Sequence, residues 1–543
     1  RGQWASKAEF ILVVAGHAVG LGNLWRFPYL CYKNGGGAFL IPYCLLAVVF
    51  GVPLFLLETS LGQFTQEGFI TCWRKVCPLA QGIGYAQLMV KLSGFNYIII
   101  QAWSLFYLVF SFRAQLPWAT CNNTWNTDNC GDLQNLDSLP NNVTGNESMQ
   151  LNTTSAATEF WERRMLRMSG GIEELGSVSW ELVLCLLACW VFCFFSIWKG
   201  VRSSGKVTYF TATFPYVMLL ILLIRGATLP GAGEGIYYYL HPDLSRLAHF
   251  EVWIEAGSQF FSYSLTQGTL SVLGSHSKYN NNCYKDCFWI CLLNSCTSFV
   301  AGFVVFSVLG FMAHKQGVTV DTVADSGPGL AFIAYPQATA LMPLPQFWTV
   351  CFFLMLFLLA VDSHVITVIT LLIESISCLL NAMKKVFDFL TNLVLIRTMG
   401  FVHSCLFQGG IYIFQFFDYY GSSRICGNFI AVCECLALGW MFGADRVCTI
   451  IKDMTGNKPS VFFRLCWKYV IPPVSLTCFI VYLLDFKHLR IGSYVYPVWA
   501  NVLGCAITLF SVLLVPLWAV IQICMTPGTI REVSTTLNMT PKW

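Results

Sequence analysis

The sequence predicts an all-α polytopic membrane protein with about twelve transmembrane helices. Of its 543 residues 56% are hydrophobic and 11% are charged, whereas charged residues make up about 25% of a soluble domain. The apolar residues gather into runs of roughly 20 residues or more, the length that crosses a bilayer. These runs fall near residues 9–31, 38–61, 83–112, 180–198, 207–225, 251–274, 287–313, 346–380, 391–407, 410–443, 465–484 and 497–524.

The short loops between these runs alternate in charge, which predicts the orientation of the chain. Every second loop carries Lys and Arg, and the positive-inside rule places such loops, with both termini, on the cytoplasmic side of the plasma membrane. A net charge of +4 is too small to indicate a nucleic-acid partner. The basic residues are Arg74, Lys75, Lys199, Arg202, Lys206, Lys278, Lys285, Lys384, Lys385, Arg446 and Lys452.

The long loop 113–179 then lies outside the cell, and its residues suit that compartment. Cys121 and Cys130 are closely spaced there, and we expect them to form a disulfide because the compartment is oxidising. The same loop contains sequons for N-linked glycosylation. These begin at Asn122, Asn142, Asn146 and Asn152.

The first apolar run contains a stretch that does not suit a continuous helix. Three glycines and a final proline occur within Gly16–Pro28, and both residue types weaken a helix interior. Non-helical backbone is tolerated in a membrane only where protein buries it or where it lines a cavity. We therefore expect an unwound helix whose free carbonyls face a desolvated cation.

A second run, 256–275, is unusually polar for the middle of a membrane. Two interrupted helices, each the first of about five spans, indicate inverted repeats with a binding site at their interface. We expect the outer segment 315–345 to lie over this site. The small and polar residues of the second run are Gly257, Ser258, Ser262, Ser264, Thr266, Gln267, Gly268, Thr269 and Ser271.

Six blocks of the chain carry a resemblance to a known family. The blocks are Gly16–Pro28, Asn34–Phe39, Trp198–Lys206, Asn280–Tyr284, Ser326–Leu330 and Phe414–Tyr420. They resemble the sodium- and chloride-dependent neurotransmitter transporters, most closely the branch for GABA, taurine, betaine and creatine. The resemblance implies one transporter domain, 1–543, with the fold of the bacterial leucine transporter. It places helices 1–5 in a first repeat, 1–226, helices 6–10 in a second repeat, 249–453, and helices 11 and 12 at 461–524.

The resemblance implies two sodium sites made of oxygen ligands, which suit a hard cation. An Asn in a membrane helix is, taken alone, more often a link between helices than a ligand. An ionised Asp362 in an apolar run costs free energy unless a cation neutralises it. The alternative is a structural Asp whose carboxylate is bonded to backbone amides. The first site would use the Ala18 carbonyl with Asn23, Ser262 and Asn294, and the second would use the carbonyls of Gly16, Val19 and Leu359 with Asp362 and Ser363.

A chloride site is predicted from Ser298, which lies one turn after Asn294 on the same helix face. Chloride-independent bacterial relatives, by this resemblance, carry Glu at that position. Where the negative charge of this Glu is absent, a mobile anion must offset the charge of the two sodium ions. Tyr43, Ser262, Asn294 and Ser298 would hold that anion.

Gln259 is the further chloride donor that the family implies, but the sequence departs from the family there. Only Phe260 and Phe261 separate Gln259 from Ser262, one residue fewer than in the family. A deletion of one residue rotates a helix by about 100°. We therefore expect Ser258, rather than Gln259, to lie one turn before Ser262.

Substrate recognition is predicted to begin at Gly20, where amine transporters of the family carry Asp. Because Gly20 has no charge, the substrate should supply a carboxylate or sulfonate that lies against backbone amides and the first sodium ion. His17 either faces the pocket, where several GABA transporters have Glu, or packs without contacting substrate. The predicted contacts are Gly20, Leu21, Gly22, Tyr97, Phe261, Ser262, Gln267 and His17.

The resemblance also implies gates on both sides of the site. Outside, Arg26 and Asp418 match the closing ion pair of the family, and Phe261 is the lid. Inside, Arg1 and Trp4 match, but the partner residues differ. His276 replaces a Tyr, and Ser377 replaces an Asp, for which Glu374 is a substitute one turn earlier. We therefore expect the contacts that close the inner gate to be weaker than in the family.

The sequence thus predicts a symporter, rather than an enzyme, that couples Na⁺ and Cl⁻ gradients to uptake of a small zwitterion by alternating access. GABA, taurine, β-alanine and betaine fit, and creatine is an alternative substrate. A transport-impaired paralogue with a binding role is the alternative function, because the second broken helix is shortened and the inner gate is altered. Membrane lipid is a partner, no organic cofactor is expected, and homo-oligomerisation is left open.

Overall fold

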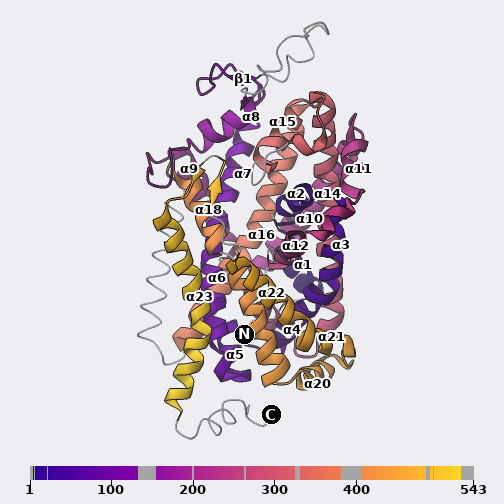
Figure 1. Cartoon of the computed structure of the whole chain (residues 1–543), viewed down its shortest axis with the longest axis vertical. Coiled ribbons are helices and arrows are strands. Elements are labelled where there is room, and N and C mark those ends of the chain that lie inside the picture. Colours follow the sequence, from indigo (N-terminus) through magenta and orange to yellow (C-terminus); the bar gives the residue numbers. More distant parts are fainter. Residues whose placement is uncertain are drawn as a thin grey trace.

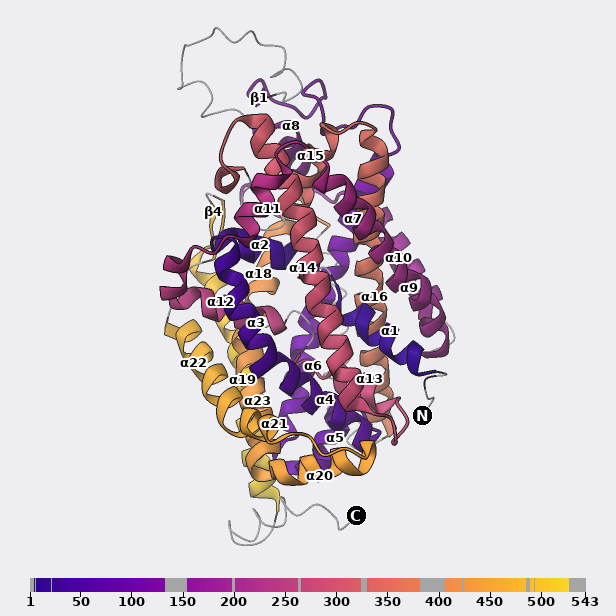
Figure 2. The ribbon, with the colours of Figure 1, turned by 90° about the vertical axis from the view of Figure 1, so that its right-hand side faces the viewer.

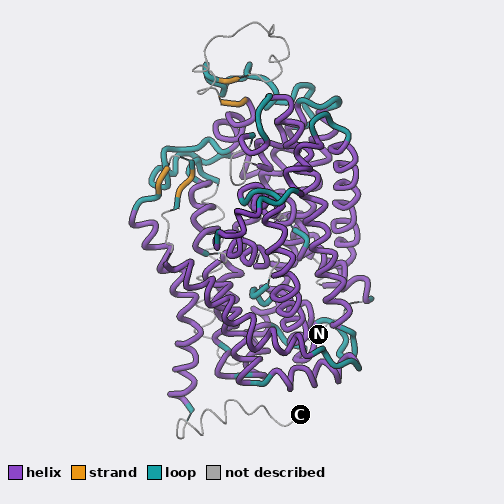
Figure 3. The backbone as a smooth tube through the Cα atoms, turned by 45° about the vertical axis from the view of Figure 1, so that its right-hand side comes forward, coloured by secondary structure: helices purple, strands orange, loops and turns teal. Residues whose placement is uncertain are grey.

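A computed structural model describes residues 4, 6–20, 22–131, 154–197, 201–261, 265–323, 330–380, 406–421, 424–484, 489–492 and 494–526. Helices make up nearly all of this backbone, and the two short strand pairs lie outside the helical bundle (Figure 3). Short 3-10 and π-helical segments are labelled η. Up to the second broken helix the elements are α1 (Lys7–Ala18), η1 (Gly22–Arg26), α2 (Phe27–Lys33), α3 (Gly37–Leu46), η2 (Ala47–Gly51), α4 (Val52–Thr65), α5 (Phe69–Val76), η3 (Pro78–Ala80), α6 (Gly82–Ser93), η4 (Gly94–Tyr97), α7 (Ile98–Phe110), β1 (Cys130–Gly131), β2 (Thr154–Ser155), α8 (Ala156–Glu159), η7 (Phe160–Met165), α9 (Trp180–Ile197), α10 (Val201–Ala227), α11 (Ala232–Leu240) and η8 (Leu244–Ala248).

The rest of the chain continues the bundle from the second broken helix onward. Its elements are α12 (Phe250–Phe261), α13 (Thr269–Ser275), α14 (Cys283–Gln316), η9 (Val320–Thr322), η10 (Leu330–Ala334), α15 (Tyr335–Ala340), α16 (Pro345–Leu380), α18 (Gly410–Tyr420), α19 (Arg424–Cys435), η11 (Leu436–Met441), α20 (Ala444–Thr455), α21 (Val461–Leu465), η12 (Cys466–Val470), α22 (Ile471–Leu484), β3 (Arg490–Ile491), β4 (Tyr494–Val495) and α23 (Val498–Met525).

Many of these helices are long and apolar enough to cross a bilayer. Within the described ranges eight helical segments qualify, or nine when the bent pair Lys7–Ala18 and Gly22–Lys33 counts as one span. Trp180–Ser196 is a shorter apolar helix, and α12 and α13 divide another predicted span. The ninth predicted run, 391–407, falls outside the described residues except for its last two positions. The chain is an all-α polytopic membrane protein, as the sequence predicts.

The two ends of the bundle differ in chemistry. One end carries β1 and α8, and the other carries α5 and α20 (Figures 1 and 2). The first end holds the disulfide between Cys121 and Cys130, which confirms the predicted pair. The second end holds basic residues of α5 and α20, namely Arg74, Lys75, Arg446 and Lys452.

A glutamate fastens the disulfide loop to the bundle. Glu159 of α8 accepts hydrogen bonds from Asn126 Nδ2 (3.0 Å), the Thr127 N–H (2.9 Å) and the Thr154 hydroxyl (2.8 Å). Partial burial raises the pKa of the Glu159 carboxyl, but these donors outweigh it and lower the pKa overall. Asn122 is exposed in the same loop, whereas Asn142, Asn146 and Asn152 lie outside the described residues.

Candidate functional site

The first broken helix is interrupted between Ala18, the last residue of α1, and Gly22, the first of η1. The two halves are bent by 48°. The interruption is shorter than the predicted stretch 16–28, because α1 continues through Gly16 and a π-helical turn resumes at Gly22. Pro28 lies in the first turn of α2, where a missing N–H removes no helical hydrogen bond.

Backbone hydrogen bonds change partners at this break. In a continuous helix the Gly20 N–H would bond the Gly16 carbonyl, and the Asn23 N–H would bond the Val19 carbonyl. Instead the Gly20 N–H donates to Asn23 Oδ1 (3.2 Å), and the Asn23 N–H donates to the Gly20 carbonyl (3.2 Å). The carbonyls of Gly16 and Val19, two predicted sodium ligands, therefore lose their usual helical donors.

Asp362 of α16 faces this break from the neighbouring helix. Its side chain is buried, and its Oδ1 accepts a hydrogen bond from the Thr211 hydroxyl of α10. Its Oδ2 is also buried and has no hydrogen-bond partner among the described residues. A Cβ built on Gly16 would lie 3.0 Å from that Oδ2. The backbone of α1 therefore approaches a carboxylate oxygen that has no donor.

The remaining residues predicted for the second sodium site lie at the same contact. A Cβ built on Gly20 would lie 2.8 Å from Ser363 Oγ, and Ser363 Oγ donates to the Leu359 carbonyl (3.4 Å). Val19 and Leu359 line one narrow cavity together. A carboxylate, a hydroxyl and freed carbonyls form an oxygen donor set that suits a hard monovalent cation.

The residues predicted for the first sodium site form a second cluster. Asn23 Nδ2 donates to Asn294 Oδ1 (2.8 Å), to the Asn294 carbonyl (3.2 Å) and to Ser298 Oγ (2.8 Å). All three residues are buried. Asn23 and Val19 line the same cavity, so both predicted sites adjoin one break. These bonds also link α14 to the first broken helix, which is the structural role weighed above for an intramembrane Asn.

The chloride residues are only partly brought together. Asn294 and Ser298 share the cluster just described, whereas the Tyr43 hydroxyl donates to Ser295 (3.4 Å). Gln259 Nε2 donates to the Gly22 carbonyl (3.0 Å). The shortened helix thus still places Gln259 against the first broken helix.

The second broken helix is interrupted after Phe261, as its polar sequence predicts. Residues 262–264, including Ser262, lie outside the described residues, as does Leu21. Thr266 (φ 63°) and Gly268 (φ 71°) are in the left-handed region, which ends the helical path. Gln267 Nε2 donates to the Phe261 carbonyl (3.1 Å) and so satisfies an acceptor at the end of α12.

Two predicted substrate contacts have distinct surroundings. His17 is 5% exposed, and both ring nitrogens are buried without a hydrogen-bond partner in the described part of the chain. The Tyr97 hydroxyl donates to Asp418 Oδ1. This bond joins the predicted substrate tyrosine to the predicted outer gate, and the ion pair of Asp418 with Arg26 stays a prediction.

The predicted inner end of the site has contacts that the sequence did not reveal. Trp4 Nε1 donates to the Leu273 carbonyl (3.2 Å), and the Trp4 N–H donates to the His276 carbonyl (3.2 Å). Lys7 forms an ion pair with the buried carboxylate of Asp286 (2.7 Å). Arg1 and the side chains of Glu374 and Ser377 lie outside the described residues. Trp4 thus contacts the backbone of His276, the residue that stands where the resemblance implies a Tyr.

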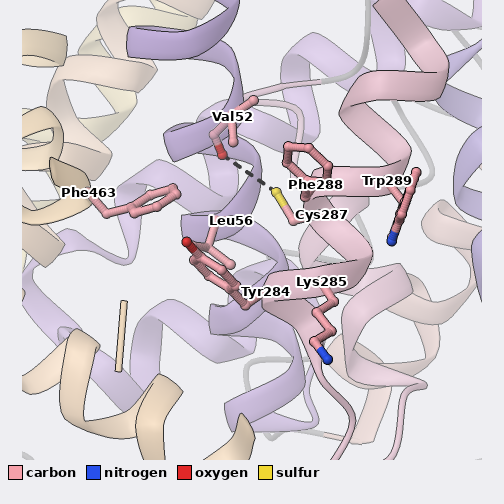
Figure 4. Close-up of a pocket in the computed structure, with 8 residues that line it drawn as sticks. All are labelled: Val52, Leu56, Tyr284, Lys285, Cys287, Phe288, Trp289 and Phe463. Atoms are coloured by element: carbon pink, nitrogen blue, oxygen red, sulfur yellow. Dashed lines mark hydrogen bonds between the residues drawn. The ribbon is translucent and has the colours of Figure 1, made fainter. Parts of the chain in front are cut away.

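A separate cavity lies away from the two breaks, on the side of the bundle. It has a volume of about 190 Å³, and its walls come from α4, α14 and α21 (Figure 4). The Cys287 thiol donates to the Val52 carbonyl at its edge (3.6 Å). None of its lining residues is a predicted site residue; they are Val52, Leu56, Tyr284, Lys285, Cys287, Phe288, Trp289 and Phe463.

Comparison with known proteins gives concordant matches over nearly the whole chain. The sequence is 49% identical over 541 residues to the sodium- and chloride-dependent GABA transporter 2 of Rattus norvegicus, covering 98% of this chain and 88% of that protein. It is 47% identical over 547 residues to the Homo sapiens protein of the same name, covering 98% and 88%. It is 48% identical over 538 residues to the sodium- and chloride-dependent taurine transporter of Canis lupus familiaris, covering 97% and 86%.

The profile of one family extends over the same length. It matches residues 1–526 and is described as the sodium:neurotransmitter symporter family. Both broken helices, the clusters of Asn23 and Asp362 and the disulfide loop lie within this match. With identities near one half over nearly all of the chain, the protein belongs to the sodium:neurotransmitter symporter family.

Proposed function

We propose that this chain is a plasma-membrane symporter that couples the Na⁺ and Cl⁻ gradients to uptake of a small zwitterion of the GABA or taurine type. One observation carries the proposal. Two backbone carbonyls in the first broken helix have lost their usual helical donors, and a buried carboxylate oxygen with no donor among the described residues lies against the same backbone. A bound cation would satisfy this arrangement, because isolated buried oxygens are costly inside a membrane.

Coupling follows from the charges that move together. Each Na⁺ that enters through a potential of ~100 mV contributes about 2.3 kcal/mol. Two Na⁺ and one Cl⁻ carry one net positive charge inward with a neutral zwitterion. The membrane potential, together with the sodium concentration gradient, then drives accumulation of the substrate.

The proposed pocket recognises both ends of the zwitterion. The substrate carboxylate or sulfonate lies against Gly20, Leu21 and Gly22, close to the first sodium ion, because Gly20 offers no competing charge. Tyr97 is proposed to donate to the same group after it leaves Asp418, so substrate binding and the outer gate share one hydroxyl. His17, Phe261, Ser262 and Gln267 surround the other end. No described residue bonds either ring nitrogen of His17, which leaves both nitrogens available to a substrate.

The proposed orientation places α5 and α20, with both termini, in the cytoplasm, and the disulfide loop outside. It is supported by basic residues at the α5 and α20 end, which the positive-inside rule assigns to the cytoplasm. During alternating access, the contact between Tyr97 and Asp418 would open on the outer side, and the contact between Trp4 and the end of α13 would open on the inner side in turn.

Uptake into cells that express the chain tests this proposal. Radiolabelled GABA, taurine, β-alanine, betaine and creatine are compared, with Na⁺ replaced by choline and Cl⁻ by gluconate in turn, and surface expression is measured by biotinylation. We expect saturable uptake of at least one substrate that requires both ions. Normal surface expression without uptake of any of the five would contradict the proposal and favour a transport-impaired paralogue.

A further inference from the structure

An apolar groove lies on the side of the bundle, apart from both broken-helix clusters and from the cavity of Figure 4. Its walls come from α3 with η2, from α12, from α19 and from α22, and its volume is about 530 Å³. Figure 2 shows α3, α12 and α22 next to one another at one edge of the bundle. Sites for small molecules have volumes of about 300–1,000 Å³, so this side groove is large enough to hold a ligand.

The groove exists because the helix faces around it do not fill the space between them. One face of α12 forms a wall, with the i, i+3, i+4 and i+7 spacing of Phe250, Trp253, Ile254 and Gly257. Gly257 has no side chain to place in the groove. A Cβ built on it would meet only Leu46 Cδ1, at 3.8 Å, which is ordinary van der Waals contact. A larger side chain at this position would therefore enter the groove.

The side groove opens onto the surface of the bundle that meets the bilayer. Its walls belong in part to the membrane-crossing segments Gly37–Thr65 and Val461–Leu484. Leu45, a wall residue, is exposed, and so are Leu476 and Ile480 on α22. Exposed apolar side chains in membrane-crossing helices contact lipid tails. The groove is thus continuous with the lipid-facing surface of the protein.

The walls offer few polar atoms to an occupant. The Thr477 hydroxyl donates to the Pro473 carbonyl (2.8 Å), and Trp253 Nε1 donates to the Leu247 carbonyl (3.1 Å). Asn428 is 3% exposed. None of the described residues that line the groove is charged. A fatty-acid carboxylate or a sterol hydroxyl inside the groove would therefore lack a good partner, and an unpaired polar group costs free energy there.

A hydrocarbon tail has the chemistry that these walls favour. Lipid tails are as apolar as leucine side chains, and an unfilled groove would deprive its walls of dispersion contacts. A tail that lies along α12 would restore these contacts, while the headgroup of the same lipid stays at the membrane surface. Two-tailed phospholipids supply such tails on the lipid-facing side of the protein.

The groove also adjoins the end of α12 that carries the predicted lid. Phe50, a wall residue of η2, packs edge to face against Phe261, with ring centroids 5.8 Å apart. Its ring also lies 6.3 Å from that of Phe260. An occupant of the groove would therefore contact α12 directly along one face and indirectly, through Phe50, at its last residue.

We propose that the side groove is a binding site for one acyl tail of a membrane phospholipid, which lies along α12 between α3 and α22 and packs against Phe50. The assignment concerns the lipid-facing surface of the folded chain. It does not depend on which substrate is carried or on whether the chain transports one.

Photolabelling of the purified full-length chain in phosphatidylcholine nanodiscs tests the assignment without requiring transport. A small fraction of the phosphatidylcholine carries a diazirine in one acyl tail, and the labelled positions are located by mass spectrometry after irradiation and digestion. We expect labels on the wall segments 250–257 and 473–478. The exposed residues Leu509 and Leu513 of α23 report labelling by bulk lipid and serve as the internal reference.

Gly257→Leu should empty the groove of lipid, because the new side chain occupies the same space. We expect labelling of segment 473–478, relative to α23, to fall by about fivefold or more. Gly233→Leu on α11 is the matched control, since a Cβ there meets open space, and it should label as the wild type does. Val474→Trp fills the groove from α22 and is read at segment 250–257, so the test stands if Gly257→Leu does not fold.

Four results would overturn the assignment. Labelling of α23 without labelling of the walls in the wild type would mean that protein, a second copy of the chain included, covers the groove. Equal wall labelling of the wild type and both filling variants, or an equal loss in Gly233→Leu, would remove the groove as the site. Stronger wall labelling by a diazirine sterol than by the tail probe would assign the groove to sterol. Wild-type protein that takes up no substrate would count against the proposed function and would leave these labelling results unaffected.

Discussion

At the scale of single residues, the site combines small residues with side chains that lack donors. Gly16 and Gly20 let the first broken helix approach Asp362 and Ser363 closely enough that a methyl group would touch them. Asp362 offers one oxygen to Thr211 and leaves the other without a donor. The chemistry of the site therefore depends on particular atoms, which single substitutions can change.

Asp362→Asn should reduce Na⁺-driven uptake to background while the protein still reaches the cell surface. The amide can still accept from Thr211, so the fold is retained, but the negative charge that offsets a cation is lost. Uptake as a function of Na⁺ concentration measures the effect, and Asp243→Asn in an exposed loop is the control. An unchanged Na⁺ dependence would remove Asp362 from the proposed site.

Gly16→Ala should raise the Na⁺ concentration needed for half-maximal uptake by about tenfold or more, which corresponds to a loss of about 1.4 kcal/mol. The added methyl carbon would lie 3.0 Å from Asp362 Oδ2 and would push the carboxylate away from the break. Gly233→Ala is the matched control, because a methyl group there meets open space. Equal Na⁺ dependence of the two variants would contradict the close approach at Gly16.

Ser298→Glu should relieve the chloride requirement of uptake. The new carboxylate would stand beside Asn23 and Asn294 and would supply the negative charge that a mobile anion otherwise brings. Uptake in gluconate medium, divided by uptake in chloride medium, measures the change. Continued strict chloride dependence of Ser298→Glu would count against this anion site.

His17→Glu should improve uptake of substrates with a distal amine, such as GABA, relative to betaine. The ring of His17 is buried and unpartnered, and a carboxylate in its place would pair with an ammonium group. Competition of unlabelled GABA and betaine against one labelled substrate gives the ratio. An unchanged ratio would favour the interpretation that His17 only packs.

At the scale of elements, the two broken helices are interrupted by different means. The first uses the Asn23 side chain to accept a hydrogen bond from the Gly20 N–H, followed by a π-helical turn. The second uses two residues in the left-handed region and a glutamate from α4. Glycine, proline and polar residues predict where each break falls. They do not predict its length, because hydrogen bonds made after folding decide how many residues stay non-helical.

The disulfide loop is a further element whose stability depends on an ionised carboxylate. The lowered pKa of Glu159 means that this carboxylate stabilises the folded loop fully above its unfolded pKa of about 4.3. That contribution is lost as the pH falls through the folded value. We expect Glu159→Gln to increase protease cleavage of the loop at neutral pH, and the difference from wild type to shrink in strong acid. Equal cleavage at neutral pH would contradict the role of Glu159.

At the scale of the whole molecule, the pattern of apolar runs predicts the helical bundle, and the close pair of cysteines predicts the disulfide. Asn23, Asn294 and Ser298 come together as the family resemblance implies. The sequence did not predict the hydrogen bond from Thr211 to Asp362 or the ion pair of Lys7 with Asp286. In each case the two residues are remote in sequence, and no local pattern marks them as partners. Tyr97 and Asp418 were assigned to separate roles, and only the folded chain shows that the Tyr97 hydroxyl donates a hydrogen bond to Asp418.

The contact of Trp4 with α13 has a consequence for how such proteins diverge. Trp4 binds the end of α13 through the main-chain carbonyls of Leu273 and His276, and every residue type offers a main-chain carbonyl. The acceptors in this contact are therefore insensitive to the side chain, and a substitution at position 276 retains the main-chain carbonyl that accepts the hydrogen bond. An unusual residue there is accordingly poor evidence that a lineage has lost transport, whereas a change of Trp4 would remove the indole hydrogen bond to the Leu273 carbonyl.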